Sequence, residues 1–334
     1  MTEHKFPFLR LPDDLRSKVL QTTEYLEMIA YSFVSKKAYS MIQSFRLPIL
    51  TVRITMKKQP EIEVKLSAIS IKFGLNMQEN DEKMTHLNGL PVNVRVTYLN
   101  FENHEFSKKI STWTNQGKTV GEWIQHLCSI SQAECYVADF LVRDIELDTP
   151  TLRKIFPKLR TVSVKFPQAE ANENDITSAK HVFKAFLVDV KDVRLEQFPF
   201  QDNLSLQHIG MGNSKILQLY DPRNIRIDDL LTLNAESIFL KTSQVPLRDL
   251  NSFFKLWKKG SNPKLEKLNV MWEPTRNFIP KWKILMKGLK AKKSRAEGEV
   301  PMKFRIKNVR GALAEIRCVF FDIHLAYVQF TVSI

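Results

Sequence analysis

The chain has 334 residues, 43% apolar and 26% charged, which is close to average soluble globular usage. This composition excludes a collagen-like or generally disordered chain, and no apolar run reaches the roughly 18 residues that a membrane-spanning helix needs. The net charge of +14 comes from residues 241–310, which hold 19 Lys or Arg against 5 Asp or Glu. Such a localised basic surface favours an acidic protein, a phosphopeptide, nucleic acid or anionic lipid as a partner.

Residues 6–47 have the pattern of a small helical module. Apolar side chains recur at roughly helical spacing over residues 15–33, and the carboxylates of Asp13 and Asp14 precede them, as is favoured at a helix N-terminus. A further helical stretch spans residues 35–45. A module of about 40 residues rarely has enough core to be stable alone, so we expect it to dock on a partner or on the following domain.

Residues 48–118 are predicted to be a strand-rich connector. Apolar and polar side chains alternate there with the period of two that half-buried strands show. A polar stretch, residues 78–88, is predicted to be a loop. The expected strands are residues 50–56, 61–66, 67–73 and 92–98.

From Thr119 helices and short strands alternate. Thr119 begins an expected amphipathic helix, with Glu122 at the spacing of a capping box. Residues 156–164 and 262–270 have similar sequences, and each segment includes the start of an expected strand. The spacing of the αβ units is roughly 25–30 residues where it can be judged, which is typical of leucine-rich repeats. The expected strands are residues 140–145, 159–166, 193–197, 237–240 and 265–271, and the expected helices are residues 175–188, 226–233, 246–258 and 280–290.

The last part, residues 302–330, is strand-rich, with a hairpin turn expected at Asn308–Gly311. The fold class predicted for the whole chain is therefore α+β: a helical N-terminal module, a strand-rich connector and leucine-rich-repeat-like αβ units. Its expected parts are residues 1–47, 48–118 and 119–334.

The sequence contains no recognisable catalytic or metal-binding motif. Cys128, Cys135 and Cys318 form no close pair, which predicts buried free thiols and no disulfide framework or zinc site. The common hydrolase, zinc-protease and phosphate-loop motifs do not occur. With no visible signal peptide, we expect a cytoplasmic or nuclear protein that is not an enzyme and needs no cofactor or metal.

The N-terminal segment resembles the F-box. The resemblance rests on Leu11-Pro12, on the paired aliphatics that follow, and on the step Ser35-Lys36-Lys37, after which Tyr39 stands where the motif often has Trp. The phrase from Phe6 to Pro12, the stretch of residues 250–266 around Trp257, and the ending from residue 304 to residue 316 are similar to a lineage-expanded F-box group with a type-2 F-box-associated region.

The resemblance implies the substrate-recognition subunit of an SCF-type ubiquitin ligase. Its F-box, residues 1–47, would bind a Skp-type adaptor and through it a cullin scaffold, while residues 119–334 would bind a protein substrate. Short helices that bind such a partner present a row of apolar anchors. The expected anchors are Leu9, Leu11, Pro12, Leu15, Val19, Leu20, Met28, Ile29, Val34 and Ile42. Each of them could instead belong to the core of the module.

The substrate surface is expected in the basic stretch, where an acidic or phosphorylated protein would fit. The candidate residues are Lys258, Lys259, Lys283, Lys287 and Lys290. Residues 281–293 form a basic amphipathic pattern, which we interpret as a surface helix packed on the sheet in preference to a membrane-binding one. Two alternatives stay open: an adaptor-bound protein that works outside a ligase, and a nucleic-acid-binding protein that uses the interleaved aromatics for stacking. Helical core spacing of Phe253, Phe254 and Trp257 argues against stacking.

Overall fold

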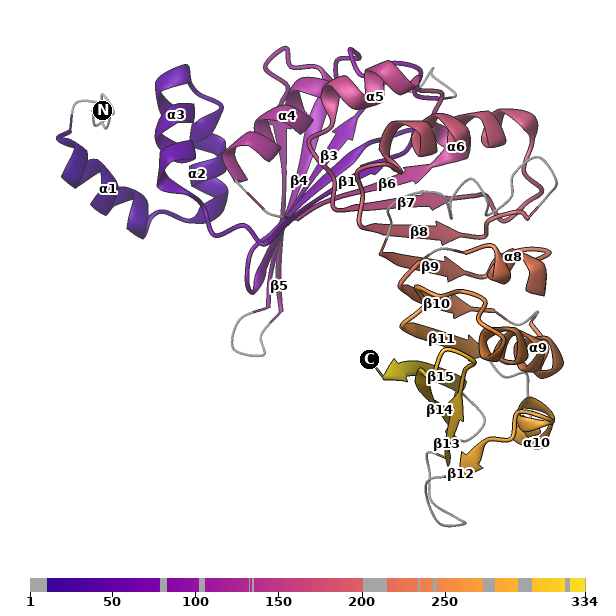
Figure 1. Ribbon diagram of the computed structural model, residues 1–334. Helices are drawn as coiled ribbons and strands as arrows, with labels where there is room; N and C mark the ends of the chain where they lie inside the picture. Colours follow the sequence, from indigo (N-terminus) through magenta and orange to yellow (C-terminus); the bar gives the residue numbers. More distant parts are fainter. Residues whose placement is uncertain are drawn as a thin grey trace. The chain divides into compact units, whose positions relative to one another are not determined.

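The structure is a computed structural model (Figure 1). It describes residues 11–78, 83–101, 106–131, 133, 135–200, 215–233, 235–242, 245–272, 280–293, 302–321 and 325–333. The chain forms two compact units: the first comprises residues 1–54, 59–79 and 87–136, and the second comprises residues 55–58, 80–86 and 137–334. The three-part division expected from the sequence stays an interpretation.

The first unit combines the N-terminal helices with an antiparallel sheet. Its elements are α1 (Asp13–Thr22), α2 (Tyr25–Ser32), α3 (Lys36–Phe45), the start of β1 (Thr51–Met56), β2 (Glu61–Lys65), β3 (Ile69–Asn76), β4 (Asn93–Asn100), β5 (Ser107–Thr114) and α4 (Val120–Ser131). The predicted helices of the N-terminal module and the strands near residues 50, 61, 67 and 92 are confirmed, and Ser35 accepts a hydrogen bond from the backbone of Ala38 at the start of α3.

Alternation places the apolar side chains of this sheet on one face. Phe73 of β3 is paired with Val96 of β4, and all the odd-numbered residues of β3 are buried. The opposite face carries charged side chains such as Lys72, whose ammonium group lies 3.7 Å from the Glu63 carboxylate. An antiparallel sheet with one covered and one polar face is the arrangement that a period of two produces.

The covered face meets α4, which begins with the predicted capping box. The backbone N–H of Thr119 donates to the Glu122 carboxylate at 2.8 Å, and the Glu122 N–H donates to the Thr119 hydroxyl at 3.2 Å. The Thr119 backbone N–H and the Thr119 hydroxyl both donate to the Glu122 carboxylate, and these two hydrogen bonds lower the pKa of Glu122. The sequence prediction for this helix start is therefore confirmed.

A cluster of aromatic rings joins the N-terminal helices to α4 and the sheet. The Phe33 ring stacks on His126 with centroids 3.9 Å apart, and it lies 4.4 Å from Trp123. Trp113 of β5 meets Phe33 and Phe73 edge-on, at 6.5 and 5.7 Å. Because such pairs stabilise a fold beyond the area they bury, this aromatic cluster supplies core that the three helices lack.

The second unit is built on a ladder of parallel strands. Its elements are β6 (Tyr136–Leu141), η3 (Val142–Asp144), α5 (Thr149–Ile155), β7 (Thr161–Lys165), α6 (Glu173–Phe186), β8 (Asp192–Glu196), β9 (Ile216–Tyr220), α8 (Ile227–Leu231), β10 (Ser237–Lys241), α9 (Leu247–Lys258), β11 (Lys267–Trp272), α10 (Trp282–Met286), β12 (Lys292–Lys293), β13 (Met302–Lys307), β14 (Leu313–Phe321) and β15 (Leu325–Ser333). Figure 1 shows α6, α8 and α9 along one side of this ladder.

Paired apolar side chains run through the parallel strands in two columns. One column consists of Ala138, Val162, Val193, Leu217, Ile238 and Leu268, and the other of Phe140, Val164, Leu195, Leu219, Leu240 and Val270. All twelve side chains are buried. β15 then pairs antiparallel with β11 and extends both columns through Phe330 and Val328.

The chain ends in antiparallel strands. β13 and β14 are joined by the predicted turn, in which the Asn308 side chain accepts hydrogen bonds from the backbone of Arg310 and Ala312. Gly311 takes a positive φ of 91°, a conformation that glycine adopts without strain. The hairpin expected at Asn308–Gly311 is confirmed.

Several expected boundaries were wrong. The strand expected at residues 140–145 is β6, residues 136–141, because Val137 and Phe140 pair with β7 and the chain turns into η3 at Val142. The helix expected at residues 280–290 is only α10, because Gly288 has a φ of 74°. Lys292 and Lys293, which the amphipathic pattern of residues 281–293 placed in a surface helix, form the short strand β12 paired with β13. β5, β9 and α5 were not predicted.

We predict that His126 makes the protein less stable in acid. Burial lowers its pKa from 6.5 to about 4, with a smaller effect of Lys118, so the unfolded chain takes up a proton at a pH where the folded chain does not. As the pH is lowered from about 6.5 to about 4, the free energy of unfolding therefore decreases, and His126 accounts for roughly 1–3 kcal/mol of this decrease. Urea unfolding at both ends of this range should show a smaller loss for His126→Gln than for the wild type. His86→Gln, at an exposed position, is the control, and equal losses for His126→Gln and the wild type would contradict the assignment.

Candidate adaptor-binding site

Two apolar side chains of α1 lie at the surface. Leu15 and Val19 are four residues apart, so they share one face of the helix, and each is 42% exposed. Pro12, at the start of α1, is also exposed and Leu11 is half-buried. This surface, Leu15 with Val19, is hereafter called the α1 patch.

A groove lies between α1 and α3. Its volume is about 620 Å³, and it is lined by Arg16, Ser17, Leu20, Gln21, Lys37, Ser40, Met41, Ser44 and Phe45. The lining contains two basic side chains, several hydroxyls and the apolar side chains of Met41 and Phe45. A groove of this kind fits side chains of a partner helix that are apolar along one edge and acidic along the other.

Four of the expected anchors belong to the interior of the chain. Leu20, Met28, Ile29 and Ile42 are at most 4% exposed, so as packed they offer a partner almost no surface. Val34, in the turn between α2 and α3, is 68% exposed. Leu9 lies outside the described residues. Adaptor contact stays a prediction, and the exposed Pro12, Leu15, Val19 and Val34 are its strongest candidates.

The sequence interpretation missed Lys37, Met41 and Phe45 as groove residues. Their spacing of four along α3 places them on one side of that helix, and this pattern is visible in the sequence. Helical spacing shows which residues share one face of α3, but it does not show which element packs on that face. The sequence therefore could not show that α1 leaves this face of α3 uncovered.

The basic residues of the second unit form an exposed surface around α9 and α10. Lys259, Lys283, Lys287 and Lys290 are exposed. Lys258 is half-buried, and its ammonium group donates to the Leu289 carbonyl at 2.6 Å. Four of the five expected lysines are therefore at the surface, while Lys258 fixes the chain after α10.

Asn251 holds this surface in place. Its buried amide donates to the carbonyls of Leu285 and Lys287, at 2.6 and 3.0 Å. Leu285 and Leu289 are fully buried under α9, so the segment after α10 is fixed by both packing and hydrogen bonds. α10 therefore packs through Leu285 on α9, whereas the sequence interpretation had this segment packed on the sheet.

Four aromatics of the basic stretch, Phe253, Phe254, Trp257 and Trp272, belong to the core. Phe254 and Trp257 pack on Phe330 with centroids 5.1 and 4.9 Å apart, and Phe253 is fully buried. Trp272 is 3% exposed and donates its indole N–H to the Val245 carbonyl. These four rings cannot stack on bases, which require exposed aromatic faces.

The cysteines and carboxylates do not suggest chemistry. Burial raises the pKa of Cys128 and of Cys318 to about 12, so both thiols stay protonated. Cys135 is half-buried. Within the described ranges, no cluster of three metal-ligating side chains occurs and no helix is long and apolar enough to cross a membrane.

Comparison with known proteins agrees with this organisation. Residues 8–50 match the F-box domain model, and residues 205–270 match the F-box associated model. The chain is 22% identical over 284 residues to the F-box associated domain-containing protein sdz-33 of Caenorhabditis elegans, covering 79% of this chain and 78% of that protein. No solved structure matches the chain.

The F-box match covers α1, α2 and α3, so these helices are the part of the chain that is similar to an F-box domain. The second match covers β9, α8, β10, α9 and most of β11, together with residues outside the described ranges. The two matches, an F-box domain followed by a type-2 F-box associated region, are those that the sequence resemblance indicated.

We predict that Asn251→Ala destabilises the protein by about 1–3 kcal/mol, because two buried carbonyls lose their donor. Amide hydrogen exchange should rise in residues 285–290 more than in β10. Ser252→Ala on the same helix is the matched control, since its hydroxyl bonds only within α9, and should change stability by less than about 0.5 kcal/mol. An unchanged exchange rate after residue 285 in Asn251→Ala would refute this anchoring role.

Proposed function

We propose that this protein is the substrate-recognition subunit of an SCF-type ubiquitin ligase. The F-box binds a Skp-type adaptor, and through it a cullin scaffold, while the F-box associated region binds a protein substrate. Both regions are typical of non-catalytic substrate adaptors, so the protein contributes no reacting group of its own.

The exposed α1 patch is the observation that carries this proposal. Burying the exposed part of the Leu15 and Val19 side chains contributes about 1 kcal/mol each, which adds to the driving force for a stoichiometric complex. Because the patch is apolar, its contribution is largely insensitive to salt. The neighbouring groove, with Arg16 and Lys37, would add polar complementarity to an acidic partner.

Such a receptor accelerates the reaction only by bringing its substrate close to the ubiquitin thioester. Holding a substrate lysine near a ubiquitin thioester replaces an encounter in solution by a reaction within one complex. A rigid connection between F-box and substrate-binding region would favour this, and within the first unit the aromatic cluster fixes the F-box helices on α4.

The ladder of the second unit supports a repeat interpretation. Paired positions follow one another along the chain at Val137, Thr161, Asp192, Ile216, Ser237 and Lys267. These steps of 24, 31, 24, 21 and 30 residues overlap the range of leucine-rich repeats. We therefore propose leucine-rich-repeat-like units.

The substrate would contact the exposed lysines around α9 and α10. Their charge favours an acidic or phosphorylated protein, whose carboxylates or phosphates would be bound by Lys259, Lys283, Lys287 and Lys290. We place the protein in the cytoplasm or the nucleus, where such ligases act and where free thiols persist.

The test of adaptor binding is co-purification of the full chain with a Skp-type adaptor in about 0.5 M salt, where charge contacts are screened to a few ångströms. We expect a one-to-one complex for the wild type. Leu15→Asp with Val19→Asp should weaken it at least about 100-fold, because two apolar contacts are lost and carboxylates are placed against an apolar partner.

The control is Val188→Asp with Val309→Asp, two exposed valines of the second unit. It places the same charges on apolar surface positions outside the F-box and should leave adaptor affinity unchanged. Both double variants should keep the wild-type circular dichroism spectrum. The absence of an adaptor complex with the wild-type chain would favour the nucleic-acid alternative, in which the affinity for nucleic acid falls steeply with salt.

A further inference from the structure

One edge of the first unit's sheet is open to solvent. Among the described strands, β5 is paired with β4 alone, over its full length from Ser107 to Thr114. Every second backbone N–H and C=O of β5 therefore points away from the sheet. Such an edge pairs readily with an extended chain, which is the basis of peptide recognition by strand addition.

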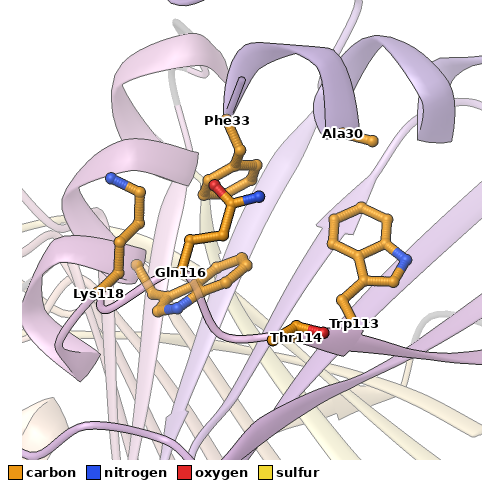
Figure 2. Close-up of a pocket in the computed structure, with 7 residues that line it drawn as sticks. Ala30, Phe33, Trp113, Thr114, Gln116 and Lys118 are labelled. Atoms are coloured by element: carbon orange, nitrogen blue, oxygen red, sulfur yellow. The ribbon is translucent and has the colours of Figure 1, made fainter. Parts of the chain in front are cut away.

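A pocket adjoins this edge at Trp113. Its volume is about 310 Å³, and it is lined by Ala30, Phe33, Trp113, Thr114, Gln116, Lys118 and Trp123. Figure 2 shows the Trp113 indole standing opposite Phe33 and Gln116, with Ala30 on the helix above and Lys118 on the far side. The volume and the aromatic walls with a few polar groups suit one apolar side chain with a polar end.

The pocket and the strand edge share one face of the sheet. Trp113 is paired with Val94, so its side chain lies on the same face as Ser111 and Lys109. Directly paired residues of neighbouring strands have their Cβ atoms about 4.5–5.5 Å apart. A chain added to β5 would place the side chain opposite Trp113 at the pocket.

The charges along the edge are basic. Lys108 and Lys109 are exposed, and the ammonium groups of Lys109 and Lys118 lie 5.9 Å from the ring centres of Tyr98 and Phe33. The nearby Glu122 carboxylate is occupied by the helix cap of α4. Lysines on an edge oppose a neutral or basic strand, and a second copy of β5 would bring like charges together. An acidic strand is the one that they attract.

We propose that the outer edge of β5 and the adjoining pocket bind an extended acidic peptide segment of a partner protein. The backbone of the peptide pairs with β5, an aromatic or aliphatic side chain enters the pocket beside Trp113, and carboxylates four or five residues away meet Lys109 and Lys108. This site lies outside the F-box associated region and does not depend on assembly of a ligase.

The probe is a fluorescein-labelled peptide of eleven residues, with a central Trp, a pair of Asp or Glu at each end, and Thr or Val between them. Placing the carboxylates on both sides of the Trp allows either strand direction. Fluorescence anisotropy with the full chain, in about 0.1 M salt, should show saturable binding. The same peptide methylated on every second backbone nitrogen should bind at least about tenfold more weakly, because it lacks the donors for strand pairing.

Two variants with matched controls locate the site. Trp113→Ala should weaken binding at least about tenfold, whereas Ile110→Ala, an exposed residue of the other face of β5, should not. Lys108→Glu with Lys109→Glu should weaken binding at least about tenfold and less so in high salt. Lys287→Glu with Lys290→Glu, in the basic surface of the second unit, should leave it unchanged.

Several results would overturn the proposal. They are the absence of saturable binding, equal binding of the methylated peptide, or a loss caused only by the Lys287 and Lys290 changes. Displacement of the peptide by a Skp-type adaptor would make the adaptor the occupant of this edge and would also overturn it. If the peptide does not bind but the adaptor complex forms, the proposed ligase function stands. If the adaptor complex does not form but the peptide binds, the peptide site at β5 stands.

Discussion

Burial of the two apolar columns in the parallel ladder is the constraint on which the second unit depends. β8 offers two inward side chains, Val193 and Leu195, and both continue the columns only because the neighbouring strands are in register. A one-residue slip of any strand would turn its apolar pair outward. The register is therefore fixed by the strands, while the connections between them are free to differ in length. This explains how a sequence without a regular repeat still forms a regular ladder.

The first unit solves a different problem, because its helices are too short to bury a core of their own. Met28, Ile29 and Ile42 fill the interior, and Phe33 completes it by stacking on His126 of α4. Met28, Ile29 and Ile42 are buried and have almost no surface left for a partner. Within the N-terminal helices, α1 therefore keeps apolar surface exposed, at Leu15 and Val19. The difference between the buried side chains of α2 and α3 and the exposed ones of α1 therefore follows from packing alone.

Much of this fold can be predicted from local pattern. Period-two alternation located β1, β2, β3 and β4, and the Thr119–Glu122 pair located the start of α4. The strand β5 was not predicted, because nearly all its side chains are exposed and its sequence therefore lacks the alternation of apolar and polar residues. The sequence also could not separate Leu15 from Leu20, since the same residue type at helical spacing serves as a surface anchor in one case and as interior in the other. That distinction depends on which neighbour covers each face.

The pocket beside β5 is a site that could not be predicted from the sequence, for the same reason. Phe33, Trp113 and Trp123 come from three separate segments, and only the pairing of the strands and the packing of α2 on α4 bring them together. In the basic stretch the sequence was more informative: the charge is visible there, and the helical core spacing of Phe253, Phe254 and Trp257 predicted the burial that the structure shows. The lysines of the second unit's basic surface can neutralise carboxylates or phosphates, whereas the four buried rings of that stretch cannot stack on bases. The α1 patch is apolar, so it is suited to a partner that must stay bound when salt weakens charge contacts.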